Sequence, residues 1–431
     1  MEIVIRRISK LNLIHILILA LLLRVAWLIY AQPIPISDFG EYRLLASNLI
    51  MYHQFGYPIP TAYRLPGYPI FLALFLLVNN SNLWLGFINV LLSLLIVYFV
   101  YILASILTEN IKIGLIASFL AAIYPIYIFF SPILASEHLF TVLLYGGLIL
   151  ILSPVDGRKI YITRFFAGGL LGAAMITRGE VIYYIPIIAL LAILPSKKKS
   201  GEEVKTRNSH RIISLFLLMI AWGIIILPWY IRNQKVIGPG SGIGTSGGIM
   251  FYYGHHNENQ VWEDLLADEN LGNGEATRSA NAFQKGLSYI YQTPISIQLR
   301  DKVIEALRLY APNDYPVFWS VALPRADDGT RQEKPLPGIE IFSMLAISGY
   351  LILGTLAFLA LFFIKNYPPR FWITILGFAL MNLLGYAVLF AATSRYRYTI
   401  EGFLCILAGS ILWQFYRFLL QRRAAIAMVS S

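Results

Sequence analysis

The sequence predicts an all-α protein that crosses a membrane many times. Of its 431 residues, 58% are apolar and only 13% are charged, proportions that soluble globular domains do not show. Several apolar runs, including 11–31, 83–107, 212–231 and 339–364, also reach the ~20 residues that a helix needs to cross the ~30 Å hydrocarbon core of a bilayer. The first run is long enough to span and has no evident cleavage site, so we expect a retained helix, not a signal peptide.

Basic residues at the ends of the apolar runs predict which side each end faces. The N-terminal residues 1–10, the lysine-rich loop 196–211 and the C-terminal residues 417–423 carry clusters of Lys and Arg. Short cytoplasmic loops are enriched in these residues, so both termini and this loop should be cytoplasmic. The net charge of +11 has the same explanation, and we expect membrane lipids as partners and no nucleic acid.

These three cytoplasmic assignments predict about ten transmembrane helices. The apolar run 67–79 is only about thirteen residues long, below the ~17 residues of the shortest ordinary span, and a crossing there would turn the lysine-rich loop outward. We therefore expect it to be a juxtamembrane helix on the outer side. The expected spans are 11–31, 83–107, 112–131, 138–152, 164–177, 180–195, 212–231, 339–364, 371–392 and 399–416.

One sizeable extracytoplasmic region should interrupt the spans. It begins with the glycine-rich run 238–248 and contains a helix-like stretch around 279–310. The glycine run has no Lys-Ser/Thr after it and no strand before it, which excludes a P-loop and leaves a flexible connector or a mobile lid. The chain therefore divides into a transmembrane module, residues 1–231, with an outer loop 32–82, an extracytoplasmic region 232–338, and C-terminal helices 339–431.

Many ionisable residues fall on the outer side of this topology. Ionisable groups near membrane depth are costly and are therefore functional candidates. Arginine pairs well with phosphate, and Asp or Glu can serve as a general base toward a hydroxyl. Together they suit attack of a hydroxyl on a lipid-phosphate sugar. The set comprises Asp38, Glu41, Arg64, Glu137, His138, Arg178, Glu180, Arg232, His255, His256, Arg395 and Arg397.

Six stretches carry most of these ionisable residues: SDFGEYRLLASNLI at 37–50, TAYRLPGYPIFLALF at 61–75, SEHLF at 136–140, TRGE at 177–180, PWYIRNQKVIG at 228–238 and SRYRYTIEGFLCILAG at 394–409. They resemble motifs of the GT-C membrane glycosyltransferases, in the group of the protein O-mannosyltransferases and the lipid A aminoarabinose transferases (families 39 and 83). Asp38 and Glu41 are separated by two residues where many relatives have adjacent carboxylates, and Leu65 stands where proline is common. The resemblance covers nearly the whole chain.

This resemblance implies a GT-C fold and a mannosyltransferase-like enzyme of the cell envelope, in the plasma (inner) membrane. The enzyme would transfer a sugar, with inversion, from a polyprenyl-phosphate donor to a lipid, glycan or protein acceptor on the extracytoplasmic side. Asp38 matches the catalytic aspartate, as base or as the group that positions the acceptor. The further catalytic candidates are Glu41 and Glu137, and the donor-phosphate candidates are Arg64, Arg178, Arg232, Arg395 and Arg397.

Plainer explanations and other functions remain open for these residues. Asp38 and Glu137 are also placed to cap helices, and Glu41 to pair with Arg64 or Arg43. A divalent metal ion is a possible cofactor, with His256 as a candidate ligand, although adjacent histidines have no diagnostic spacing. The alternative functions are a transporter or flippase of lipid-linked sugars and an O-antigen polymerase or ligase, which would not need Asp38.

Overall fold

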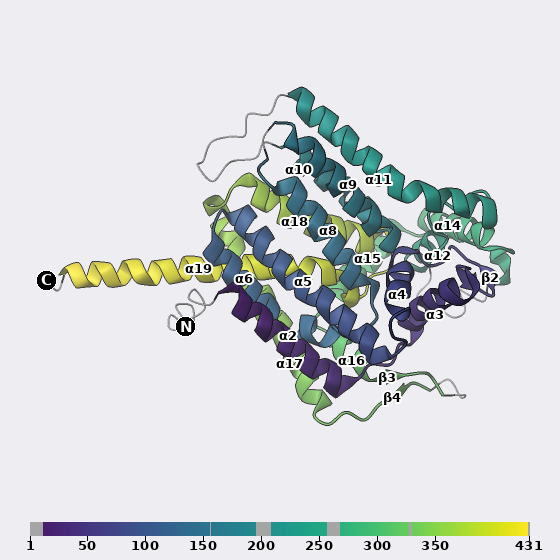
Figure 1. Ribbon diagram of the computed structural model, residues 1–431, viewed down its shortest axis with the longest axis horizontal. Coiled ribbons are helices and arrows are strands. Elements are labelled where there is room, and N and C mark those ends of the chain that lie inside the picture. Colours follow the sequence, from purple (N-terminus) through teal and green to yellow (C-terminus); the bar gives the residue numbers. More distant parts are fainter. Residues whose placement is uncertain (1–11, 156, 195–207, 257–267, 327–329, 430–431) are drawn as a thin grey trace.

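The computed structural model describes residues 12–155, 157–194, 208–256, 268–326 and 330–429. The predicted all-α polytopic class is confirmed, because seven of the helices described are long and apolar enough to cross a membrane (Figure 1). Over these ranges the strands form two short antiparallel pairs. They are β1 (Gly56–Tyr57) with β2 (Ile59–Pro60), and β3 (Ala322–Leu323) with β4 (Gln332–Glu333).

Each of the ten expected spans corresponds to a helical segment. The seven long ones are α2 (Leu13–Ala31), α5 (Asn82–Thr108), α9 (Lys159–Thr177), α11 (Asn208–Val236), α17 (Ile339–Ala360), α18 (Pro369–Leu383) with the π-helical turn η3 (Leu384–Leu389), and α19 (Tyr398–Val429) with the 3-10 turn η4 (Ser394–Arg397). Shorter apolar helices fill the other three places: α6 (Ile111–Ile123), α8 (Ser136–Leu152) and α10 (Val181–Ile193). A 3-10 segment, η2 (Leu361–Asn366), follows α17.

The remaining short helices come from the two regions expected on the outer side. In Figure 1, α2 begins and α19 ends toward the left, whereas α3, α4, α12 and α14 lie toward the right-hand end of the bundle. Pieces that are far apart in sequence therefore meet at one end. These helices are α3 (Ser37–Tyr52), α4 (Gly67–Leu76), α12 (Ser246–Tyr253), η1 (Glu269–Leu271), α14 (Glu275–Gln292), α15 (Ile295–Tyr310) and α16 (Tyr315–Val321).

Prolines correct two sequence expectations. The expected single span 112–131 is divided into α6 and α7 (Pro125–Phe130), because proline has no backbone N–H and disfavours a helical residue before it. The stretch 279–310 is divided in the same way, between α14 and α15, at Pro294. The expected three-way division of the chain stays a prediction; α11 runs past its first boundary to Val236.

A buried arginine stabilises the break after α6. Arg24 on α2 is fully buried and donates hydrogen bonds to the carbonyl oxygens of Ala121 and Ala122, at 3.1 and 2.9 Å. It also donates to Ser93 Oγ at 2.9 Å. The last carbonyls of a helix have no partner within the helix, so Arg24 supplies the donors that the interrupted helix lacks.

Close packing of α4 on α9 brings the first outer loop to the centre of the bundle end. A Cβ atom on Gly67, the first residue of α4, would lie 2.4 Å from Thr177 Oγ1 at the end of α9. Only glycine permits this approach. The loop that precedes α4 carries Arg64, and the residue after Thr177 is Arg178, so this contact sets two candidate site residues side by side.

Candidate active site

The first outer loop holds a carboxylate pair that shares one arginine. Asp38 and Glu41 lie three residues apart in the first turns of α3, so their side chains share a face. Arg64 Nη2 is 2.7 Å from Asp38 Oδ1, and Arg64 Nε is 2.7 Å from Glu41 Oε2. The ion pair between Glu41 and Arg64 that the sequence left open is thus formed.

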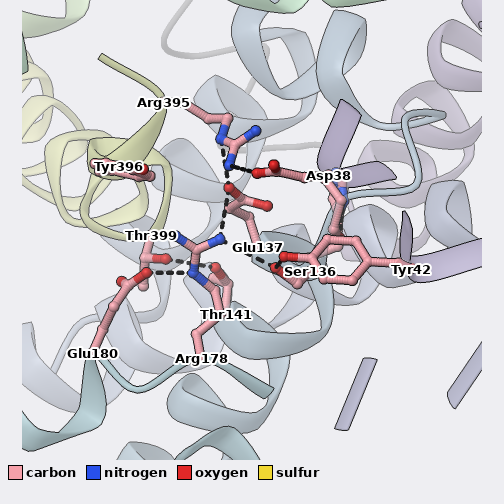
Figure 2. Close-up of polar contacts among 12 residues, drawn as sticks. Asp38, Tyr42, Ser136, Glu137, Thr141, Arg178, Glu180, Arg395, Tyr396 and Thr399 are labelled. Atoms are coloured by element: carbon pink, nitrogen blue, oxygen red, sulfur yellow. Dashed lines mark hydrogen bonds and ion pairs between the residues drawn. The ribbon is translucent and has the colours of Figure 1, made fainter. Parts of the chain in front are cut away.

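Arg395 joins this loop to the start of α8. Its Nη2 atom is 2.8 Å from Asp38 Oδ2, and its Nε atom is 2.9 Å from Glu137 Oε1. Arg178 extends this series of ion pairs. Its Nη1 atom is 2.8 Å from Glu137 Oε1, and its Nε atom pairs with Glu180. Figure 2 shows Arg395 between Asp38 and Glu137, and Arg178 between Glu137 and Glu180. We call these residues, with Arg64 and Glu41, the charge network.

The arginines keep the half-buried carboxylate of Asp38 charged. Burial would raise the pKa of the Asp38 carboxyl, but the guanidinium groups of Arg395 and Arg64 outweigh burial and hold that pKa well below its ordinary value. Burial opposes the charge of Arg178 too, yet Glu137 and Glu180 raise the pKa of its guanidinium group well above the ordinary value. The site therefore contains fixed charges of both signs at neutral pH.

Three polar residues that the sequence reasoning missed support the network. Arg178 Nη1 donates to Ser136 Oγ at 3.1 Å, and Ser136 Oγ donates to the Tyr42 hydroxyl at 3.3 Å. The Tyr396 ring centre lies 5.7 Å from the guanidinium carbon of both Arg178 and Arg395. Tyr396 stands between two arginines in the SRYRY motif, which is the signal that could have identified it.

A cavity of about 460 Å³ opens onto the network. Its charged lining consists of Asp38, Arg64, Arg178, Glu180 and Arg395. Such a volume is in the range of small-molecule sites, roughly 300–1,000 Å³. Three guanidinium groups around a carboxylate can bind a phosphate and hold a hydroxyl beside it. Further walls come from Tyr42, Tyr63, Tyr183, Tyr386, Phe390 and Tyr396, and from Ile243, Gly244, Ser246, Gly247 and Met250.

The glycine-rich segment forms one wall of this cavity, and Glu275 fastens it. Glu275 accepts hydrogen bonds from Thr61 Oγ1 at 2.5 Å, from the Ala62 backbone N–H at 2.8 Å and from Thr245 Oγ1 at 3.0 Å. The backbone N–H of Thr245 also donates to Ala62 O at 3.0 Å. The segment before it bends through Gly238, Gly240 and Gly242, all with positive φ. Glu275 therefore holds two cavity walls together from outside the cavity.

The structure does not bring Arg232 into the charge network. Arg232 Nη1 donates to Thr61 O at 2.7 Å and Nη2 donates to Phe55 O at 3.0 Å. Its guanidinium carbon lies 4.7 Å from the Trp229 ring centre. Because its donors are directed to backbone carbonyls of the first outer loop, Arg232 supports a cavity wall and does not line the cavity.

Arg397 also lies apart from the network, in the interior. Its side chain is 1% exposed, and its Nε atom is 2.9 Å from Glu401 Oε1, one turn along the same helix. Nη1 donates to Leu309 O and Ala311 O at 3.0 and 2.5 Å, and the guanidinium carbon lies 3.8 Å from the Tyr350 ring centre. Arg397 thus fastens the end of α15, although the sequence grouped it with the phosphate-binding arginines.

The expected metal ligand lies outside the network too. His256 lines a second cavity, together with Lys302 and Arg308, whose positive charges oppose a divalent cation. Among the residues that the structure describes, no group of three or more His, Cys, Asp and Glu side chains could hold a metal ion. His138 is buried among aromatic rings, with Nδ1 3.2 Å from Ala135 O. The described residues do not fit a metal site, and a metal cofactor stays a prediction.

Comparison with known proteins identifies the fold. No protein-family model matches the chain, and no curated protein matches it in sequence. The structure is similar to the oligosaccharyltransferase AglB from Archaeoglobus fulgidus in complex with an inhibitory peptide and a dolichol-phosphate, with a TM-score of 0.53, 15% identity, and coverage of 97% of this chain and 52% of AglB. The apo form of the oligosaccharyltransferase from the same organism gives a TM-score of 0.54 at 15% identity, with coverage of 96% and 52%.

The chain therefore shares the fold of this archaeal oligosaccharyltransferase, which is the GT-C fold that the sequence resemblance implied. It spans about half the length of the archaeal oligosaccharyltransferase that it matches. A further similar structure is ArnT from Cupriavidus metallidurans bound to undecaprenyl phosphate, with a TM-score of 0.47, 10% identity, and coverage of 92% of this chain and 77% of ArnT.

Proposed function

We propose that this protein is a glycosyltransferase that moves a sugar from a polyprenyl-phosphate carrier to an acceptor hydroxyl on the extracytoplasmic side, with inversion. The observation that carries the proposal is the charge network, in which three arginines and the carboxylates of Asp38 and Glu180, from distant segments of the chain, line one cavity. Glu137 joins two of these arginines from behind the lining. The AglB structure with the same fold contains a dolichol-phosphate, which supports a lipid-linked donor here.

The arginines that line the cavity would hold the donor phosphate. Arg64, Arg178 and Arg395 present guanidinium groups to one space, and charge-assisted, paired N–H donors suit phosphate oxygens. When the bond between the anomeric carbon and the phosphate breaks, negative charge grows on the leaving phosphate. Fixed cations at that position stabilise the transition state.

Asp38 would take the proton of the acceptor hydroxyl. While Arg64 and Arg395 bind both of its oxygens, Asp38 is a weak base, because these arginines lower its pKa. A donor phosphate competes for the same N–H groups, and the loss of these partners makes the carboxylate more basic. The acceptor oxygen then attacks the anomeric carbon, its proton passes to Asp38, and polyprenyl phosphate leaves.

Replacement of Asp38 by Asn tests this assignment. We expect Asp38→Asn to lower the turnover of a polyprenyl-phosphate sugar in proteoliposomes by about 10²–10⁴-fold, the usual contribution of a general base, while donor binding persists. Asp268→Asn is the matched control, because Asp268 pairs with Lys285 on the protein surface. Unimpaired turnover by a folded Asp38→Asn protein would refute the proposal, and lipid-linked sugar flipping without transfer would favour a transporter.

Cysteine labelling in intact cells tests the sidedness of the site. Tyr291, at the end of α14, is 84% exposed, and Arg422, near the end of α19, is also exposed. A membrane-impermeant maleimide should label Tyr291→Cys from outside and should not label Arg422→Cys. The native Cys405 is buried and gives little background. Labelling of Arg422→Cys alone would reverse the proposed topology.

A further inference from the structure

A second cavity, of about 580 Å³, adjoins the candidate active site. Tyr253, the last residue of α12, lines both cavities. The next residue, Gly254, packs so tightly on the backbone of Phe390 that a Cβ atom would lie 2.5 Å from the carbonyl carbon. Phe390 lines the first cavity and Ala391 lines the second. The partition between the two cavities is therefore one residue thick.

The second cavity is positively charged. Four cationic side chains line it, Lys302, Arg308, Arg325 and Arg331, against two carboxylates. Both carboxylates already have protein partners. Glu305 binds Arg308 and the Ala392 backbone N–H, each at 2.6 Å, and Asp301 binds Arg300 at 2.8 Å and the Tyr289 hydroxyl at 3.3 Å.

Lys302 is the cation that reaches the partition itself. Its Nζ atom donates to Gly254 O at 2.8 Å, which uses one of the three donors of an ammonium group. An anion in the cavity can accept the others. Lys302 thus connects the partition to the cationic lining of the second cavity.

The helix that carries Lys302 is apolar on another face. Ile295, Leu299, Val303 and Leu307 follow one another at four-residue spacing along α15, and each is between 59% and 68% exposed. We call these four residues the α15 stripe. A stripe of this kind beside charged residues is typical of a helix that lies in the interface of a bilayer.

The α15 stripe continues onto a membrane-spanning surface. α15 packs against η3 at the end of α18, and the Tyr310 hydroxyl donates to Ala379 O of α18 at 3.2 Å. Leu380, Leu384 and Val388 of this segment are also exposed. Since α18 with η3 is one of the helices suited to cross the membrane, we expect the apolar face of α15 to contact the bilayer. Its polar face lines the cationic cavity.

We propose that the second cavity binds the anionic headgroup of a membrane lipid whose acyl chains lie along the α15 stripe and α18. The shared chemistry is a phosphate group on Lys302 and the neighbouring arginines, and the apolar wall assigns that phosphate to a lipid. A lipid in this place lies one residue from the cavity of the charge network. This site has no role in binding the donor phosphate proposed above.

Native mass spectrometry of the full chain in detergent tests the lipid site. The protein is titrated with phosphatidylglycerol, with phosphatidylcholine and with inorganic phosphate. We expect retention of phosphatidylglycerol over phosphatidylcholine, and a loss of about tenfold in phosphatidylglycerol affinity in Lys302→Gln, the usual effect of removing a charge-assisted contact. Lys302→Arg should retain the lipid, which separates a charge effect from damage to the partition.

Two further variants distinguish the sources of the anion. Lys285→Gln is the matched control, because Lys285 lies on α14, pairs with Asp268 and does not line the cavity; it should bind like the wild type. Leu299→Gln in the α15 stripe should weaken phosphatidylglycerol and leave inorganic phosphate unchanged. Equal retention of both lipids, or equal loss in Lys302→Gln and Lys285→Gln, overturns the proposal. Displacement of the lipid by millimolar phosphate, with no effect of Leu299→Gln, assigns the site to a soluble anion and overturns the lipid.

Discussion

Arg395 and Arg397 stand two residues apart on the same 3-10 turn, yet they belong to different regions of the molecule. Arg395 joins carboxylates of α3 and α8 at the edge of a cavity. Arg397 binds Glu401 of its own helix and backbone carbonyls at the end of α15, in the interior. Residues two apart on a helical turn point to different sides. Arg395 therefore faces the cavity, whereas Arg397 faces the interior.

This difference shows that an arginine at the end of a membrane bundle can serve either a ligand or the fold. Arg395 and its partner Asp38 both line a space large enough for a substrate, and a phosphate there can compete with Asp38 for the guanidinium group. Arg397 has partners that are buried with it, since Glu401 is 0% exposed. The smaller cavity of about 250 Å³ that both residues line is otherwise mostly apolar. The comparison is therefore open to test by substitution on each side of Tyr396.

The largest effect on stability should come from Arg397. Arg397→Met leaves Glu401 as an uncompensated buried charge, which should lower the free energy of unfolding by about 3–5 kcal/mol. Thermal unfolding in detergent measures this as a lower melting temperature. The double variant Arg397→Met/Glu401→Met should recover most of the loss, because it removes both charges. A normal melting temperature combined with lost donor binding would return Arg397 to the phosphate-binding group that the sequence suggested.

Replacement of Arg395 should impair catalysis more than folding. Arg395→Gln removes one of the cations that we propose for the leaving phosphate, and we expect kcat to fall by about 10²–10³-fold. It also removes the main partner that lowers the Asp38 pKa, so that pKa should rise. Because the base must be unprotonated, the acid limb of the pH–rate profile should move to higher pH. An unchanged acid limb would mean that Asp38 is not the group whose ionisation limits the rate.

The convergence of charges at one end of the bundle could be predicted from the sequence, but their partners, apart from the Glu41–Arg64 pair, could not. Loop lengths and basic clusters suffice to place Asp38, Glu137 and Arg178 at the same level, since a transmembrane helix fixes the depth of its ends. Depth does not fix direction. Whether Arg232 reaches the cavity or the carbonyls of Phe55 and Thr61 depends on the rotation of its helix about the helix axis. That rotation cannot be inferred from the sequence when the helix is apolar on all sides.

The fold shows the same limit. Length and apolar composition predicted the helical segments of the bundle. The segment around Pro125, however, was predicted as one continuous helix and is broken in the structure. The break is stable because Arg24, far along the chain, supplies hydrogen-bond donors to Ala121 and Ala122. A single sequence contains no sign of that pairing, because Arg24 is an isolated charge within an apolar run.

The smallest expected effect should come from Glu275. Like Glu401, Glu275 lies outside the cavity of the charge network, but it holds two loops together and does not pair with a buried charge. Gln at this position keeps one accepting oxygen and replaces the other with a donor, so at least one of the three accepted hydrogen bonds is lost, at about 1 kcal/mol. The donor KM should rise a few-fold, by about fivefold at most for 1 kcal/mol, with kcat unchanged, and hydrogen exchange should increase over 243–250. Glu269→Gln on η1 is the control, since only its backbone carbonyl is engaged there. A fall in kcat without faster hydrogen exchange would instead place Glu275 with the charge network. The groups that act on the substrate would then include residues outside the cavity lining, which the structure assigns only to holding the walls.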